Sequence, residues 1–233
     1  MVKFHVKFNI LSFSLKDKHT IFNGIQKRLC INKFLEKHQY TTCEKVPVEL
    51  KKLISDHLKK KFEHRKENSN VANDIRTLCS CRRAAVLEKY SHLGLDWSLQ
   101  VEFDQSILIW HIATDLCYYS DWRDQDAIMS NGKLSKWQSQ CTLCLLVMCP
   151  FMLPMGLGMI KFRDACAEVT QFFEDHKSIA SYSDMSTLDK SQACEILLNV
   201  NTQVPPTKVK GDWSKSVLFD ACKLASELQA IYV

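Results

Sequence analysis

The residues with the clearest potential for chemistry are two aspartates, a histidine and a tyrosine in one apolar stretch. Asp104, His111, Asp115 and Tyr118 follow one another at offsets of 0, 7, 11 and 14 residues. In an α-helix this spacing puts all four side chains on one face. A histidine beside carboxylates can act as a general base or bind a metal ion. A hydrogen-bonded polar row that fixes helix packing has the same pattern, and we favour it because no nucleophile motif lies nearby.

The cysteines offer a second kind of chemistry. Cys141 and Cys144 form a C-x-x-C motif, but a redox or zinc site would need a thioredoxin-like context or a second ligand pair, which Cys79 and Cys81 do not supply. The chain has 11 cysteines and no apolar secretory signal at its start, so we expect reduced, buried thiols and a cytosolic soluble part. Gly156-x-Gly158 lacks the rest of a dinucleotide fingerprint, so we assign no cofactor-binding residue and expect no cofactor. We also assign no catalytic and no metal-binding residue.

The elements that must position these residues are helices. Of 233 residues only 6 are Gly and 5 are Pro, while 46% are hydrophobic, which predicts a packed, mainly α fold rather than an all-β or disordered chain. We expect an irregular domain of about seven to eight helices with one Pro/Gly-broken apolar segment. The predicted helices are 21–38, 47–66, 71–93, 103–119, 159–176, 189–200 and 213–231, with a strand over 2–10, a loop over 120–133 around Asn131-Gly132, and a loop over 177–188.

Residues 141–160 form the longest apolar run, with no charged residue in 20 positions. This length meets the simple rule for a transmembrane helix. Pro150 and Pro154, followed by two glycines, predict a helix that ends near Cys149 and restarts near Gly158. The run is therefore interpreted as a buried hairpin-like element, a re-entrant segment or a kinked span.

The charge is divided unevenly along the chain. Residues 1–67 carry 16 Lys and Arg against 7 Asp and Glu, a net charge of +9, and the remainder carries 15 against 19, a net charge of −4. The 47–66 helix is basic and amphipathic, and we favour a surface helix packed on the core over a membrane-surface helix. Binding of an anionic surface or nucleic acid through residues 45–66 is a further alternative, although no nucleic-acid-binding motif supports the second partner.

Four segments resemble a plant protein family. They are VPVELKKLISDHL (46–58), VEFD with SILIWHIATDLC (101–104 and 106–117), LLVMCPFMLPMGLGMIKFRDACAE (145–168) and KSVLFDACKLASEL (215–228). Together they are similar to the family called domain of unknown function 594, over roughly residues 30–233. The resemblance implies a plant membrane protein with an upstream multi-pass region, called domain of unknown function 4220, and a further helical tail. It implies no reaction and no catalytic residue.

On this basis the chain is expected to be a partial member of that family. We expect residues 1–45 to end an upstream region, 46–200 to form a central helical domain, 201–212 to be a Pro-containing linker and 213–233 to begin a C-terminal helical part. The predicted function is a membrane-linked interaction or scaffold module without catalysis. The predicted localisation is membrane-associated. The expected partner is a membrane or a membrane-protein region. The alternative is an enzyme that uses the His111 and Asp115 face.

Overall fold

The computed structural model describes residues 10–11, 46–66, 91–121, 129–148, 158–180, 190–203 and 216–232. These residues form seven α-helices and one short 3-10 helix, with no strand among them, so the predicted mainly α fold is confirmed. The elements are α4 (Val48–Lys66), η2 (Ser91–Leu93), α7 (Trp97–Gln100), α8 (Phe103–Asp121), α9 (Met129–Met148), α10 (Gly158–Ala180), α11 (Lys190–Leu198) and α13 (Val217–Tyr232).

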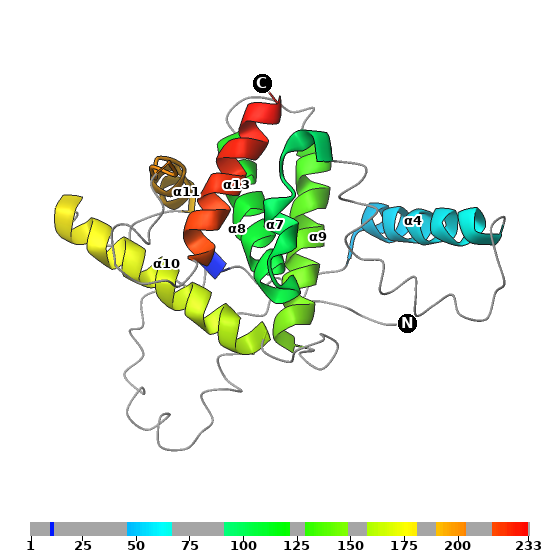
Figure 1. Cartoon of the computed structure of the whole chain (residues 1–233), viewed down its shortest axis with the longest axis horizontal. Coiled ribbons are helices and arrows are strands. Elements are labelled where there is room, and N and C mark those ends of the chain that lie inside the picture. Colours follow the sequence, from blue (N-terminus) through cyan, green and yellow to red (C-terminus); the bar gives the residue numbers. More distant parts are fainter. Residues whose placement is uncertain are drawn as a thin grey trace, which may run out of the picture.

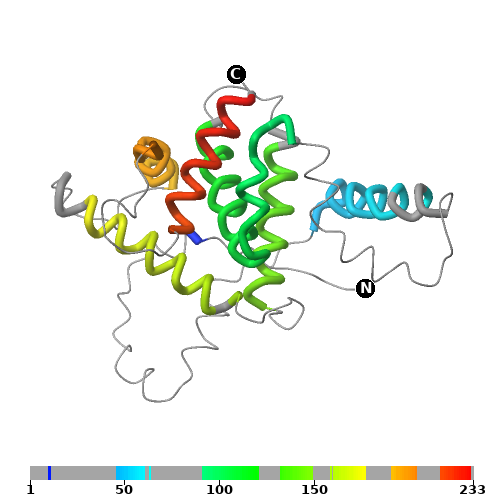
Figure 2. Tube along the Cα trace, viewed as in Figure 1, coloured from blue at the N-terminus to red at the C-terminus, as the bar shows by residue number. Residues whose placement is uncertain are grey.

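Helix α8 forms the centre of the fold. Buried apolar side chains lie on several of its sides, among them Ile107, Leu108, Ile109 and Ala113. A helix that is apolar nearly all round must be covered on every side. Accordingly α8 contacts α7, α9, α10, α11 and α13, and it lies between α9 and α13 in Figure 1. Figure 2 shows that α13, from the end of the chain, runs beside the much earlier α7 and α8.

The two ends of the apolar run lie in different helices, as the sequence predicts. Helix α9 ends at Met148 and α10 begins at Gly158, and the prolines lie outside the described residues. Gly158, at the start of α10, lies close to Leu146 of α9. A Cβ atom added there would lie 2.6 Å from Leu146 Cδ1 and 3.1 Å from the Leu146 carbonyl oxygen. Only glycine therefore allows this crossing without displacing a neighbour.

Helix α13 begins at a cap shared by two segments. The Phe219 N–H donates a 2.9 Å hydrogen bond to Ser216 Oγ, which is the usual arrangement of an N-cap serine. The Glu168 carboxylate of α10 accepts hydrogen bonds from the Ser216 hydroxyl and, at 3.2 Å, from the Leu218 N–H. A negative charge at this end also suits the helix dipole. The cap therefore fixes α10 against the start of α13.

Two sequence predictions about local structure are wrong in the described residues. The loop expected over 120–133 is helical from Met129, so Asn131 and Gly132 lie inside α9. Local propensity is a weak guide here, since the 20-residue helix α9 includes both residues. Residues 177–180, expected in a loop, extend α10. The predicted strand over 2–10 and the helix over 21–38 fall outside the described residues, except for Ile10, which is helical.

Candidate functional site

The polar row of α8, defined as Asp104, His111 and Asp115, is buried in the core. The three residues are 5%, 1% and 1% exposed, whereas Tyr118, predicted on the same face, is only partly buried. All four lie on α8, whose first and last described residues are Phe103 and Asp121. Because the side chains in the row are charged or titratable, each needs a partner inside the protein.

His111 is bound to the neighbouring helix α9. Its Nδ1 atom shares a 2.8 Å hydrogen bond with Ser139 Oγ, and its Nε2 atom lies 3.9 Å from Asp115 Oδ2. Nε2 has no hydrogen-bond partner among the described residues. Desolvation by burial lowers the pKa of His111 below its ordinary value, and Asp115 opposes this shift only in part. The imidazole is therefore held neutral at physiological pH.

Asp115 connects the row to α11 and to the end of α8. Burial and the charge of Asp115 raise the pKa of Tyr119 to about 12. The same two causes raise the pKa of Cys194 on α11 to about 12. The ammonium of Lys136 on α9 covers the rings of Tyr118 and Tyr119, with Nζ at 3.8 and 4.0 Å from their centroids. The surroundings of Asp115 keep the phenol and the thiol protonated, which is the opposite of an activated nucleophile.

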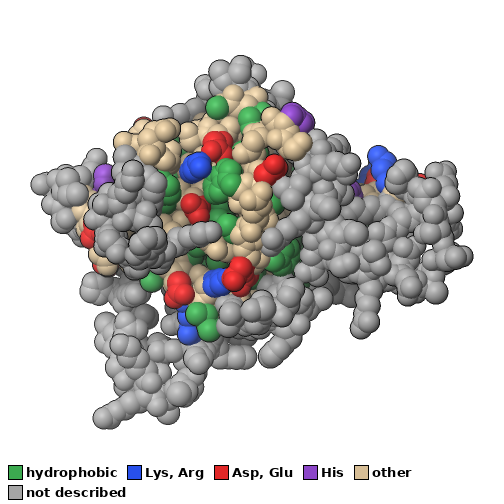
Figure 3. Space-filling model, viewed as in Figure 1, with side chains coloured by type: hydrophobic (Ala, Val, Ile, Leu, Met, Phe, Trp, Pro, Cys, Tyr) green, Lys and Arg blue, Asp and Glu red, His purple; other side chains and the backbone are tan. Residues whose placement is uncertain are grey.

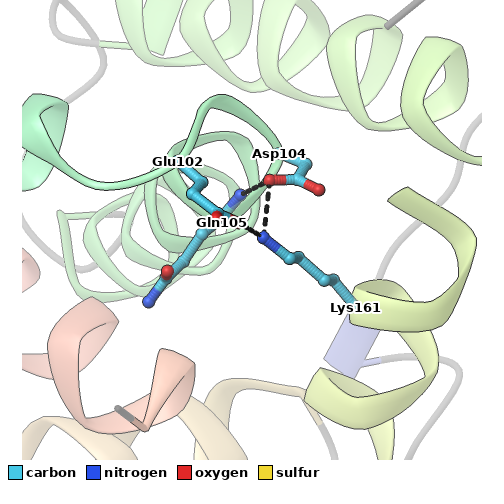
Figure 4. Close-up of polar contacts among 4 residues, drawn as sticks. All are labelled: Glu102, Asp104, Gln105 and Lys161. Atoms are coloured by element: carbon cyan, nitrogen blue, oxygen red, sulfur yellow. Dashed lines mark hydrogen bonds and ion pairs between the residues drawn. The ribbon is translucent and has the colours of Figure 1, made fainter. Parts of the chain in front are cut away.

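Asp104 belongs to a separate cluster at the start of α8 (Figure 4). Its Oδ1 atom accepts a 2.9 Å hydrogen bond from Lys161 Nζ of α10 and another of 2.9 Å from the Gln105 N–H. Lys161 also pairs with the exposed Glu102. A carboxylate in the first turn of a helix is favoured by the helix dipole. The cluster therefore joins the first turn of α10 to the first turn of α8.

The predicted face is thus divided between two places. The structure brings His111 and Asp115 together, gives Asp104 to Lys161, and leaves Tyr118 against Lys136. Sequence reasoning missed Ser139 and the role of Lys161, because both partners come from other helices and no local spacing links them to α8. In the described part of the chain, no group of three His, Cys, Asp or Glu side chains could hold a metal ion.

The C-x-x-C motif lies in the second half of α9. Cys141 and Cys144 are both partly buried, and neither forms a disulfide bond. Burial raises the pKa of the Cys141 thiol, whereas a redox-active C-x-x-C cysteine has a lowered pKa. This arrangement fits cysteines that serve as small packing residues. Cys79 and Cys81 lie outside the described residues.

Helix α4 is the most exposed element of the described structure. It contacts α9 and extends away from the other helices in Figure 1. Leu50 near its start is fully buried, but Val48, Leu53, Ile54 and Leu58 are 73%, 45%, 47% and 45% exposed. Lys51, Lys52, Lys59 and Lys60 are exposed as well, and basic side chains are visible on α4 in Figure 3. The helix predicted over 47–66 is confirmed, and its apolar stripe continues past the residue that packs.

Comparison with known proteins finds no relative of this chain. No protein-family model, curated protein or solved structure matches it. None of the described helices combines the length and apolar composition that crossing a membrane requires.

Proposed function

We propose that this chain is a membrane-linked helical interaction module without catalysis of its own. The observation that supports the proposal best is the exposed apolar and basic surface of α4. Leu53, Ile54 and Leu58 remain about half exposed on a helix that extends from the packed body. Apolar side chains gathered on one exposed helix are typical of surfaces that bind a partner.

The chemistry of the core is consistent with this proposal. His111 is 1% exposed and desolvated, and Tyr119 and Cys194, which feel the charge of Asp115, have raised pKa values. A general base has to reach its substrate and needs a pKa near the working pH. The polar row therefore suits a packing role, in which the hydrogen bond between His111 and Ser139 and the contact between Asp104 and Lys161 fix how α8 meets α9 and α10.

The likeness to the domain of unknown function 594 family supports the membrane link and the plant context of the proposal. On this view the chain is part of a longer membrane protein, and the region described here lies on the cytosolic side of the membrane. We propose that the described helices bind a membrane or a membrane-protein region through α4.

Fractionation of cells that express the full chain tests the proposed function. We expect the chain to sediment with membranes at physiological salt and to be released by alkaline carbonate, because α4 offers surface contacts. Recovery of the whole chain in the supernatant at low salt would refute the membrane link. A turnover that disappears in a folded His111→Gln variant would refute the absence of catalysis.

A further inference from the structure

Leucine and isoleucine side chains of α4 gather on one side of the helix together with the exposed His57, whereas the exposed Val48 lies on the opposite side. With successive residues about 100° apart, Leu50, Leu53, Ile54 and Leu58 span an arc of about 140°. Lys51 and Lys60 fall about 20° outside the two ends of this arc. The exposed part of the apolar stripe is therefore bordered by a lysine on each side.

The acidic residues of α4 lie elsewhere on the helix. Glu49, Asp56 and Glu63 are spaced seven residues apart and so share one side, about 130° from the centre of the apolar arc. Asp56 and Glu63 are exposed, as is Glu49. The side of α4 that carries Leu53, Ile54 and Leu58 thus presents apolar groups bordered by Lys51 and Lys60. The carboxylates, and with them Lys52 and Lys59, are turned away from it.

A partner helix fits this surface poorly. Continuing the heptad positions of Leu50 and Leu53 along α4 places His57 and Lys60 at the next two seam positions. A coiled-coil seam would have to bury both polar side chains. A second copy of α4 would bring the lysines of two like-charged stripes together. Nucleic-acid phosphates would satisfy the lysines but leave the exposed apolar residues in water.

We propose that this side of α4 docks on an anionic lipid surface. The inference rests on the proposed function and names its partner: acidic headgroups bind the lysines, and Leu53, Ile54 and Leu58 enter the boundary between headgroups and acyl chains. Lysine stems at the edges of an apolar stripe can lie along the interface while their ammonium groups reach the headgroups. The carboxylates on the far side of α4 then face water rather than the negatively charged surface.

The test is co-sedimentation of the full chain with lipid vesicles at physiological salt. One set of vesicles contains phosphatidylserine in phosphatidylcholine, and the other contains phosphatidylcholine alone. Two variants alter α4: one carries Lys51→Gln and Lys60→Gln, and the other carries Leu53→Ser, Ile54→Ser and Leu58→Ser. A control variant carries Lys190→Gln and Ile160→Ser, an exposed lysine and an exposed apolar residue on α11 and α10. Circular dichroism and thermal melting confirm that each variant is folded.

We expect binding to the phosphatidylserine vesicles only. The lysine variant should bind about 30-fold more weakly, since each lysine near an anionic surface contributes about fivefold. The apolar variant should bind about 100-fold more weakly, because three half-exposed side chains no longer enter the interface. The control should stay within about twofold of the parent chain.

Several outcomes would overturn the inference. These are no binding to either vesicle, equal binding to both, or binding that the α4 variants leave unchanged. A dimer in sedimentation velocity that the apolar variant abolishes would assign the surface to a second copy instead. Binding to duplex DNA that only the lysine variant weakens, without vesicle binding, would assign it to nucleic acid. A chain that sediments with cell membranes but not with protein-free vesicles would retain the proposed function and refute the lipid contact.

Discussion

Replacing Gly158 by alanine probes the crossing of α9 and α10 most directly. An added methyl group would lie 2.6 Å from Cδ1 and 3.0 Å from Cγ of Leu146, and 3.1 Å from its carbonyl oxygen. Leu146 is fully buried, so its side chain has little room to rotate away. The helix start or the leucine must therefore move to accept the methyl group.

The expected size of the effect follows from two opposing contributions. Alanine is favoured over glycine in a helix by up to about 1 kcal/mol. Forcing an extra methyl group into a packed core destabilises by about 1–3 kcal/mol, and the backbone contact at 3.1 Å places Gly158 towards the upper end. We expect a net loss of about 2 kcal/mol in the free energy of unfolding, which lowers the melting temperature by about 4–8 °C in a chain of this length.

The assay is urea unfolding monitored by circular dichroism, with Gly132→Ala as the matched control. A Cβ at Gly132 would meet only the Tyr118 ring at 3.8 Å, an ordinary contact, so this change inside α9 should stabilise the protein by about 0.5 kcal/mol. A double variant with Leu146→Ala completes a mutant cycle. Because the shortened leucine makes room for the methyl group, the double variant should be more stable than the sum of the two single changes by at least about 1 kcal/mol.

A neutral or stabilising Gly158→Ala change would refute the reasoning. So would strict additivity with Leu146→Ala. Either result would mean that the two helices do not approach as closely as the contact at Gly158 requires.

Three other predictions concern buried or partly buried polar contacts. Since burial lowers the pKa of His111 below 6.5, its stabilising contribution is complete above pH 6.5 and is lost as the pH falls through the folded pKa. In urea titrations below pH 6.5 the free energy of unfolding should therefore fall by up to about 1.4 kcal/mol per pH unit. The His111→Gln variant should lack this part of the pH dependence. Lys161→Met should lower the free energy of unfolding by about 1–2 kcal/mol, a value reduced because the pair is partly exposed. Adding Asp104→Asn should restore part of this loss. An unchanged stability of the Lys161→Met variant would contradict the ion pair. Glu168→Ala should cost about 1–2 kcal/mol and lower amide-exchange protection at the start of α13, and full protection would contradict a capping role.

Local sequence pattern predicts the helices well because a helix is held by contacts three and four residues apart. The helix expected over 103–119 is observed as Phe103–Asp121, and the one expected over 189–200 as Lys190–Leu198. The local pattern fails where turn-forming residues fall inside a longer helix. Asn131 and Gly132 have the composition of a turn, yet both lie inside α9.

The candidate site was predictable only in part, because some of its contacts come from helices distant in the sequence. Helical spacing correctly placed His111 and Asp115 side by side, four residues apart on α8. It could not show that Asp104 turns to Lys161, which lies 57 residues further along the chain, or that Ser139 of α9 binds the imidazole. The sequence favoured a packed surface helix for 47–66, and only the exposed fractions of its leucines and isoleucine revealed how much of the stripe is left uncovered.

The position of α13 against α8 has a consequence for how the protein is made. Cys117 and Ala225, which touch across the two helices, are 108 residues apart, and Trp97 and Glu227 are 130 residues apart. At about 5–20 residues per second, a ribosome needs roughly 5–20 s between the two helices. During that interval α13 has not been made, so the apolar side of α8 that it later covers is not yet buried against it. We therefore expect chaperones to bind the nascent chain mainly in this interval.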